Sequence, residues 1–368
     1  MKFKKILLTV LLVIIAVLVL VNSETVRLSV AKAIDTCLFS LVPSLMTFMT
    51  VAGFISNSAC CDVLDRIFGR VIRLVFNLPE NCTRVVLLGA LGGYPCGARL
   101  IGDMLDKNEI DTATAQRMLR FCINASPAYV ISAIGVGLFG SARIGFVIFL
   151  SHILTAWLIG SLFRGKKTPK TNTAKPQRLP LSETFVKSVL DSTNSMISIS
   201  GFAITFSTIL ALLDVTGITQ AFITLTKPLT NNPDISRTVL YELFDVVTGT
   251  QASLQCPPMP ALLLCSGAVS FGGFSIIAQT AFCLSGHKLN FFEVFLFRLL
   301  HSVLTGAATY IIINISDTTV TTAYLLGTNP QQTQTGFVST ALFLICCVFF
   351  TVTVDKKISL LLQRRKRQ

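Results

Sequence analysis

The segment from Arg84 to Leu105 reads RVVLLGALGGYPCGARLIGDML and is apolar at both ends, but Gly-Gly-Tyr-Pro-Cys-Gly interrupts it at residues 92–97. Pro95 lacks a backbone donor, and the neighbouring glycines allow dihedral angles that other residues avoid, so we expect a helix, a break and a second helix. Each half is too short to cross a bilayer, which takes roughly 20 apolar residues per helix. The segment therefore predicts a re-entrant helical hairpin, with a kinked spanning helix as the simpler alternative.

A broken backbone at membrane depth has consequences for function. Unpaired amides are tolerated there only where they are packed in protein or line a polar cavity, so the break predicts a binding site. We expect the second half-helix to begin near Gly97, with its free amides and positive dipole end facing the break and with Arg99 close by. Such a site suits a small anionic or strongly polar molecule.

The composition excludes a soluble globular protein. The chain has 368 residues, of which 52% are hydrophobic and 13% charged, whereas soluble domains carry about 25% charged residues. Its net charge of +13 comes from loops and tails beside apolar segments, which indicates membrane topology and not a nucleic-acid partner. The 11 cysteines show no disulfide or metal-ligand pattern. We expect an all-α polytopic membrane protein in contact with lipid, without metal or cofactor, and a homo-oligomer is left open.

The first 163 residues predict an N-terminal membrane anchor and a first transmembrane repeat. Residues 1–22 contain lysines before an apolar run, which is typical of a signal peptide or of a spanning helix; without a good cleavage site, we expect a retained anchor with a cytoplasmic N-terminus. In the first repeat, residues 23–163, we expect an amphipathic surface helix over 63–76, the broken hairpin, a polar helix over 112–120, and spans over 37–55, 123–139 and 144–163.

A basic, Pro/Thr-rich stretch at residues 164–183 predicts a flexible linker between two halves. The second repeat is expected over 184–313, and residues 314–368 should hold a last spanning helix, 337–354, and a basic tail. Within the second repeat, the hydrophobic pattern predicts a span over 196–213, an apolar stretch over 218–225, an interrupted region over 238–255, an apolar run over 260–284 broken at Gly272-Gly273, and a span over 291–313.

The two halves resemble one another in order. Thr83-Arg84 is matched by Ser236-Arg237, residues 97–99 by 249–251, residues 124–127 loosely by 271–274, and His152 by His301, which argues for an internal duplication. Lysine and arginine counts place the 164–183 linker and the tail in the cytoplasm, and the 314–336 loop, which has neither residue, on the opposite side. The repeats are therefore expected to be inverted, as in many secondary transporters.

Paired motifs carry a resemblance to a known family. Residues 93–99, Asn124, Pro127 and the glycine-rich 135–140, together with 243–245, Gly249, 271–275 and Gln279, resemble the nucleoside-recognition (Gate) domain family. The resemblance runs from about Val30 to Ile313 and is closer to the sporulation integral membrane proteins of the YlbJ type. Arg99 stands where that family usually has lysine, and Asp245 where it usually has glutamate.

The resemblance implies a function and a location. Members of this type are implicated in moving dipicolinic acid into the developing spore, and the wider fold is similar to concentrative nucleoside transporters. We therefore expect a secondary transporter of a small organic anion, most simply dipicolinate, as a multi-pass protein of the mother-cell-derived outer forespore membrane. The alternatives are a transporter of nucleosides or other small polar metabolites, and a non-transporting protein of the spore envelope. The lack of a nucleophile with a base, a ligand cluster or a P-loop argues against an enzyme.

The candidate substrate-binding residues lie at or near the breaks. Arg99 is the strongest candidate contact, with a snorkelling cytoplasmic anchor as its alternative. Asp245 lies in an apolar stretch, where a carboxylate is costly unless paired or hydrated, so it predicts either a structural pairing or a coupling role. His152 and His301 favour helix contacts over a proton relay. The neutral side chains among the candidates predict either ligand hydrogen bonds or packing. The full set is Tyr94, Pro95, Gly97, Arg99, Asn124, Asp245, Gly249, Ser275 and Gln279.

Overall fold

The computed structural model describes residues 2–165, 180–316 and 320. Every regular element in these ranges is helical, which confirms the all-α class. Most of the 164–183 linker, the predicted last span over 337–354 and the basic tail lie outside the described residues. The re-entrant placement of the hairpins, the inversion of the repeats and the domain boundaries stay predictions.

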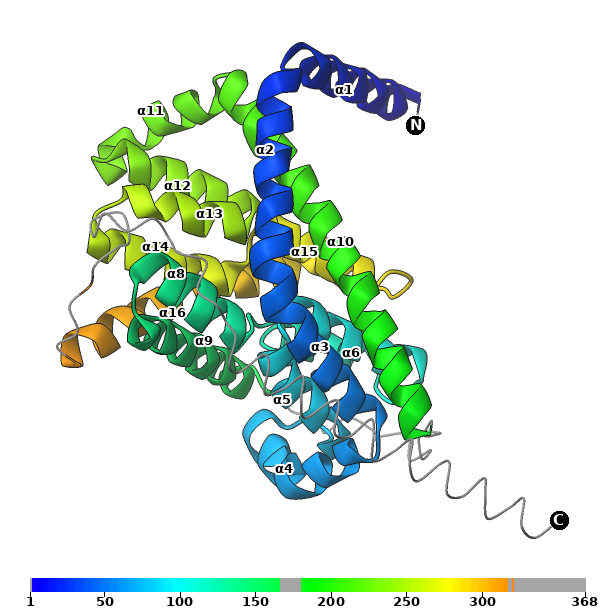
Figure 1. Cartoon of the computed structure of the whole chain (residues 1–368). Coiled ribbons are helices and arrows are strands. Elements are labelled where there is room, and N and C mark those ends of the chain that lie inside the picture. Colours follow the sequence, from blue (N-terminus) through cyan, green and yellow to red (C-terminus); the bar gives the residue numbers. More distant parts are fainter. Residues whose placement is uncertain (1, 166–179, 317–319, 321–368) are drawn as a thin grey trace, which may run out of the picture.

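Among the described residues, five helices are long and apolar enough to cross a membrane. They bear large exposed apolar side chains, as expected of surfaces that face lipid. In Figure 1, the helix over Ser23–Asn57 and α10 (Leu181–Val215) lie side by side, and they pack against each other along their length. The five are Ser23–Asn57, Ala142–Leu162 (α9), Leu181–Val215 (α10), Pro258–Cys283 and Phe291–Ile315 (α16).

The N-terminal helices are longer than the sequence pattern suggested. After α1 (Lys2–Val21), the chain forms α2 (Ser23–Thr36), a short π-helix (Cys37–Leu41) and α3 (Val42–Asn57) without interruption. The predicted span over 37–55 is therefore only the second half of a continuous helix. Likewise α10 begins at Leu181, so the last residues assigned to the linker are helical.

The first hairpin consists of α5 (Thr83–Gly92) and α6 (Tyr94–Asp106), and the predicted break is confirmed. Gly93 separates the two arms with a φ of +84°, a left-handed conformation that glycine adopts without strain. The start of the second arm was predicted wrongly, because α6 begins at Tyr94 and not near Gly97. The amides of Cys96 and Gly97 donate to the Gly93 carbonyl, so they are not free to bind a ligand.

The second hairpin consists of α12 (Pro233–Phe244) and α13 (Val246–Ala252), followed by a 3-10 turn (Ser253–Gln255). Asp245 breaks it with extended dihedral angles, φ −148° and ψ 128°, and caps the start of α13. The interrupted region predicted over 238–255 is thus confirmed, and the break lies at a capping aspartate where the first hairpin has a glycine.

Two further helices are broken. The expected span over 123–139 is wrong, because residues 123–126 are not helical and lead into a short π-helix (Ala128–Val136) and α8 (Gly137–Phe139). Pro127 disfavours helical geometry in the residue before it, which explains the interruption. The break expected at Gly272-Gly273 is confirmed between α14 (Pro258–Phe271) and α15 (Gly273–Cys283), and both glycines have positive φ.

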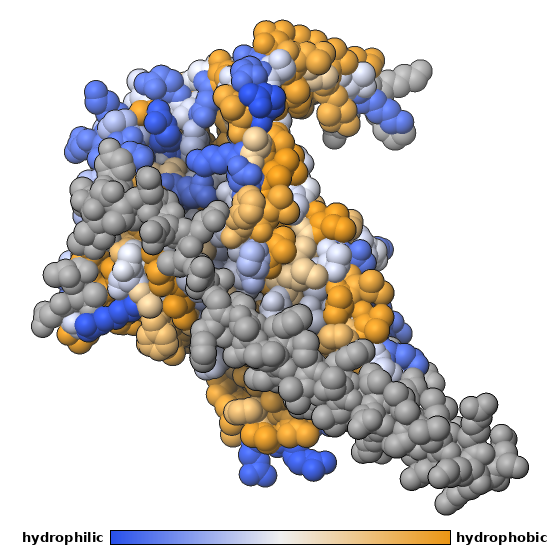
Figure 2. All heavy atoms as spheres, viewed as in Figure 1, coloured by the Kyte–Doolittle hydropathy of each residue, from blue (hydrophilic) through white to orange (hydrophobic). Residues whose placement is uncertain are grey.

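The short surface helices follow the predicted pattern. The amphipathic helix α4 (Cys60–Phe76) exposes apolar side chains together with arginines, and Figure 2 shows apolar surface over it, bordered by hydrophilic residues. The polar helix α7 (Thr112–Leu119) also forms where expected, and the apolar stretch over 218–225 lies in the helix α11 (Ile218–Thr230). An apolar face beside basic side chains is suited to the boundary between lipid and water.

The close packing of α6 on the unwound segment predicts a stability difference between two glycines. A Cβ on Gly97 would lie 2.3 Å from the Cys122 carbonyl oxygen, whereas a Cβ on Gly201, in the middle of α10, would have no neighbour within 4 Å. Gly97→Ala should lower the free energy of unfolding by about 1–3 kcal/mol through overpacking. Gly201→Ala should raise it by about 0.5–1 kcal/mol.

Thermal unfolding of the purified protein in detergent compares the two variants under the same conditions. Equal midpoints for Gly97→Ala and the unmodified protein would contradict the close approach of α6 to residue 122.

Candidate functional site

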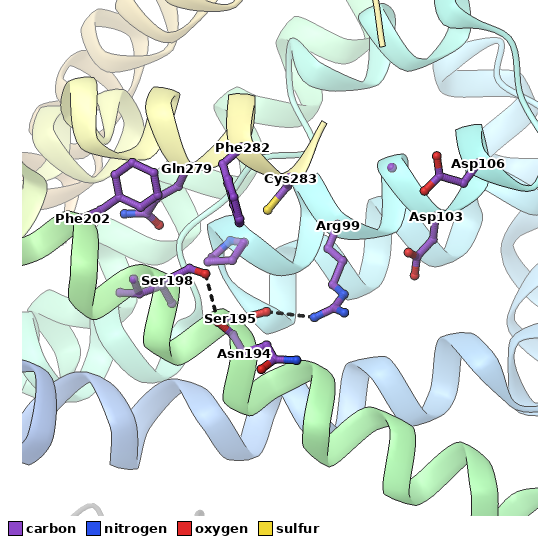
Figure 3. A pocket seen from close by; sticks show the side chains of 13 residues that line it. Arg99, Asp103, Asp106, Asn194, Ser195, Ser198, Phe202, Gln279, Phe282 and Cys283 are labelled. Carbon is purple, nitrogen blue, oxygen red and sulfur yellow. Dashed lines mark hydrogen bonds between the residues drawn. The ribbon is translucent and has the colours of Figure 1, made fainter. Parts of the chain in front are cut away.

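A cavity of about 280 Å³ lies between α6, α10 and α15 (Figure 3). α6 contributes charged side chains, Arg99, Asp103 and Asp106, and α10 contributes the neutral polar side chains of Asn194, Ser195 and Ser198. Phe202 and Phe282 add aromatic rings, with centroids 6.4 Å apart and planes inclined at 63°. The cavity therefore combines one cation, several hydrogen-bonding groups and apolar ring surfaces.

Arg99 joins α6 to α10 across this cavity. Its guanidinium forms an ion pair with Asp191 Oδ1 at 2.7 Å and donates hydrogen bonds to the Asp191 carbonyl at 2.5 Å and to Ser195 Oγ at 3.1 Å. Figure 3 shows the side chain directed toward Ser195. Arg99 thus lies in the cavity as the sequence suggested, but a carboxylate of the same protein already offsets its charge.

Gln279 has a buried polar atom without a partner. The residue is 6% exposed and lines the cavity, and its Oε1 accepts no hydrogen bond from the described residues. An unsatisfied buried acceptor costs about 1–3 kcal/mol, so this oxygen gains from a ligand that donates a hydrogen bond.

A second cavity of about 40 Å³ adjoins the first and shares Pro95, Ile199 and Gln279 with it. Its lining brings together the breaks of both hairpins, at Gly93 and Asp245, and the unwound segment that contains Ser126. Tyr94, another of the predicted residues, also lines it, and its hydroxyl donates to the Val269 carbonyl at 2.6 Å.

Asp245 is held by hydrogen-bond donors at the starts of two half-helices. Its Oδ2 accepts from the amide and the hydroxyl of Thr248 at 2.9 and 3.0 Å, and its Oδ1 accepts from Ser275 Oγ at 2.9 Å. Thr248 lies in the first turn of α13 and Ser275 in the first turn of α15. A carboxylate is stabilised at these positive helix ends, which favours the structural pairing among the two roles expected for Asp245.

Arg298 is a buried cation that the sequence analysis did not single out. It is 3% exposed, donates to the Phe271 carbonyl at the end of α14 through Nε, and donates to the Ile123 carbonyl at 2.8 Å through Nη1. Its guanidinium also lies 5.3 Å from the Tyr94 ring centroid. Its position in the sequence could have indicated it, because Arg298 lies inside the apolar run over 291–313 and intramembrane charges usually have a function or a fixed partner.

His152 and His301 stack with ring centroids 4.8 Å apart and hold α9 and α16 together. His152 Nε2 accepts from the Ala125 amide at 3.1 Å, so its Nδ1 carries the hydrogen and donates to Ser270 Oγ at 2.8 Å. His301 Nε2 is 2.9 Å from the His152 carbonyl oxygen. These bonds fix the unwound segment against two helices, which supports helix contacts as the role of the pair.

The remaining predicted residues lie away from the two cavities. Gly97 and Gly249 permit close backbone packing, the latter because a Cβ would lie 2.4 Å from Glu242 Cγ. Ser275 is bonded to Asp245, and Asn124 Nδ2 donates to the Phe121 carbonyl at 2.9 Å. The structure therefore brings Tyr94, Pro95, Arg99, Asp245 and Gln279 to the cavities, and Gly97, Asn124, Gly249 and Ser275 support the surrounding backbone.

The helices and the cavity define an integral membrane protein with broken helices around a polar site. The chain is similar to the sporulation integral membrane protein YlbJ of Bacillus subtilis (strain 168), with 24% identity over 291 residues that cover 71% of each chain. No family model and no solved structure matches it. The similarity confirms the resemblance to membrane proteins of the YlbJ type, whereas the relation to the wider Gate family stays a prediction.

The bonds of Arg298 predict a large stability effect. Arg298→Leu leaves two buried carbonyl oxygens unpaired and should lower the free energy of unfolding by about 1–3 kcal/mol for each. Arg298→Lys keeps the charge and should lose less. Arg27→Leu serves as the control, because Arg27 forms an exposed pair with Glu24 that solvent screens.

Thermal unfolding in detergent provides the measurement. An Arg298→Leu variant as stable as Arg27→Leu would show that Arg298 does not hold the broken helices.

Proposed function

We propose that this protein is a secondary transporter that moves a small organic anion, dipicolinate, into the developing spore. The cavity between α6, α10 and α15 is the observation that carries the proposal, because it places a cation and hydrogen-bonding groups beside the breaks of the membrane helices. Broken helices next to a polar cavity are the arrangement in which many secondary transporters bind their substrates.

The lining suits a planar aromatic dicarboxylate. A guanidinium such as that of Arg99 binds a carboxylate through two parallel hydrogen bonds. The Asn194 amide supplies a neutral donor for the second carboxylate, and the rings of Phe202 and Phe282 supply apolar surface for the aromatic ring. The hydroxyls of Ser195 and Ser198 donate to the Asp191 and Asn194 carbonyls, so each must rotate before it can donate to a ligand. The volume of about 280 Å³ is close to the lower end of the range for small-molecule sites, about 300 Å³.

Binding of an anion at Arg99 competes with the ion pair inside the protein. Asp191 occupies the guanidinium, and Asp103 adds a further carboxyl group to the lining. A substrate carboxylate that replaces Asp191 releases one of the contacts that hold α6 to α10. Substrate binding is thereby linked to separation of these helices, which a transporter needs in order to open its site to one side.

The arrangement of breaks supports two repeats of one architecture, which we propose to be inverted. Each half contains a hairpin broken near its centre, at Gly93 and Asp245, and a second break, at residues 123–126 and at Gly272-Gly273. His152 and His301, which occupy matching sequence positions, stack on each other, as expected of residues near a pseudo-two-fold axis. From the similarity to the sporulation protein YlbJ, we propose a location in the outer forespore membrane, and from the basic residues of the 164–183 linker we propose that this linker lies in the cytoplasm.

A nucleoside is the second candidate substrate, and particular side chains favour it. Gln279, Asn194 and the serines bind neutral polar groups, and the carboxylates of Asp103 and Asp106 suit the donors of a ribose or a base better than they suit an anion. A non-transporting role in the spore envelope is the remaining alternative.

Uptake by proteoliposomes that contain only this protein tests the proposal. Dipicolinate should accumulate and uridine should not. Arg99→Gln should reduce dipicolinate uptake by roughly 10- to 100-fold, the equivalent of about 1.5–3 kcal/mol for a hydrogen bond to a charged group. Arg99→Lys should keep part of the activity, and Arg27→Gln should behave like the unmodified protein.

The alternatives give different results. Uptake of uridine without dipicolinate would favour the nucleoside reading, and unchanged uptake by Arg99→Gln would assign Arg99 to a snorkelling anchor. Failure of the folded protein to move either compound would favour the non-transporting role.

A further inference from the structure

The second hairpin contains a buried carboxyl group that is not part of the substrate site described above. Glu242 lies on α12, is 8% exposed, and its Oε1 has no hydrogen-bond partner among the described residues. It lines neither cavity.

The side chain is enclosed where the two arms of the hairpin approach most closely. A Cβ on Gly249 of α13 would lie 2.4 Å from Glu242 Cγ, 2.7 Å from its Cα and 2.8 Å from its amide nitrogen. Only glycine permits this contact. The closed hairpin therefore buries Glu242 Oε1 and leaves the side chain only 8% exposed, through packing of α13 on α12.

The neighbouring elements supply no cation to Glu242 within the described ranges. The thiols of Cys256, which follows the 3-10 turn, and of Cys265, on α14, interact electrostatically with Glu242, and they contact Thr238 and Ser253 respectively. On the other elements packed against α12, three polar side chains bond elsewhere. Asp214 of α10 accepts from Tyr241, Thr226 of α11 bonds to Ser236, and Ser275 of α15 bonds to Asp245.

An ionised carboxylate in this position would lack a counter-ion and most of its hydration, which costs several kcal/mol. Glu242 in the closed hairpin therefore carries its proton. If α13 moves away from α12, water reaches the carboxyl group, the O–H bond breaks, the carboxylate keeps the electron pair, and the proton passes to water.

We infer that Glu242 is the proton-binding site that couples opening of the second hairpin to the proton gradient. This inference rests on the proposed transport function and adds its driving ion. A proton taken up on one side and released on the other accompanies the substrate, and it offsets part of the charge of a dicarboxylate.

Proteoliposomes with an imposed pH difference test the coupling, and exchange of labelled for unlabelled dipicolinate at equal pH tests transport itself. The unmodified protein should show both exchange and pH-driven accumulation. Glu242→Gln resembles the protonated side chain in shape, so it should keep exchange and lose the accumulation that the pH difference drives. Glu24→Gln, which changes an exposed carboxyl group, should retain both.

Exchange without any response to the pH difference in the unmodified protein would overturn the inference, as would normal pH-driven accumulation by Glu242→Gln. Absence of exchange would instead count against the proposed function. In that case the infrared difference spectrum between the unmodified protein and Glu242→Gln still decides the state of the residue. A carbonyl band of a protonated carboxylic acid at neutral pH is expected, and carboxylate bands would overturn the inference.

Discussion

A helix that ends inside a membrane protein leaves backbone groups that need partners, and in this structure two buried charges supply many of them. Asp245 accepts hydrogen bonds from groups at the N-terminal turns of α13 and α15. Arg298 donates to the carbonyls of Phe271 and Ile123, where α14 ends and the unwound segment begins. A negative charge at the start of a helix, or a positive charge at its end, offsets the partial charge that the helix dipole leaves there. Asp245 and Arg298 each contact two breaks, so each side chain stabilises both.

This use of the buried charges determines what is left for a ligand. Asp245 and the amides after Gly93 are engaged with the backbone, so the anion cradle expected from free helix amides is largely occupied by the protein itself. The groups left to bind a ligand are side chains farther along the half-helices, above all Arg99 on α6 and the unpartnered oxygen of Gln279 on α15. The broken helices thus shape the site, and α10 completes it.

The breaks followed from the sequence because their causes are local. Pro95 with Gly93, the Gly272-Gly273 pair and the charged Asp245 in an apolar stretch each interrupt a helix through their own chemistry. The contacts between residues far apart in the chain could not be predicted from the sequence. Arg99 meets Asp191 from 92 positions away, and Arg298 meets Ile123 from 175 positions away. The hydrophobic pattern predicts a span over 123–139 because the apolar run over 128–139 dominates it, whereas Pro127 acts only on its immediate neighbours.

If the cavity between α6, α10 and α15 holds the substrate, a native cysteine can report its binding directly. Cys283 lines this cavity and is partly accessible, whereas Cys60 is exposed on α4, away from it. Alkylation of the two thiols in the membrane-embedded protein, quantified by mass spectrometry with and without dipicolinate, compares them in one sample. Dipicolinate in the cavity should slow labelling of Cys283 and leave labelling of Cys60 unchanged. Equal labelling of Cys283 at saturating dipicolinate would contradict binding in this cavity.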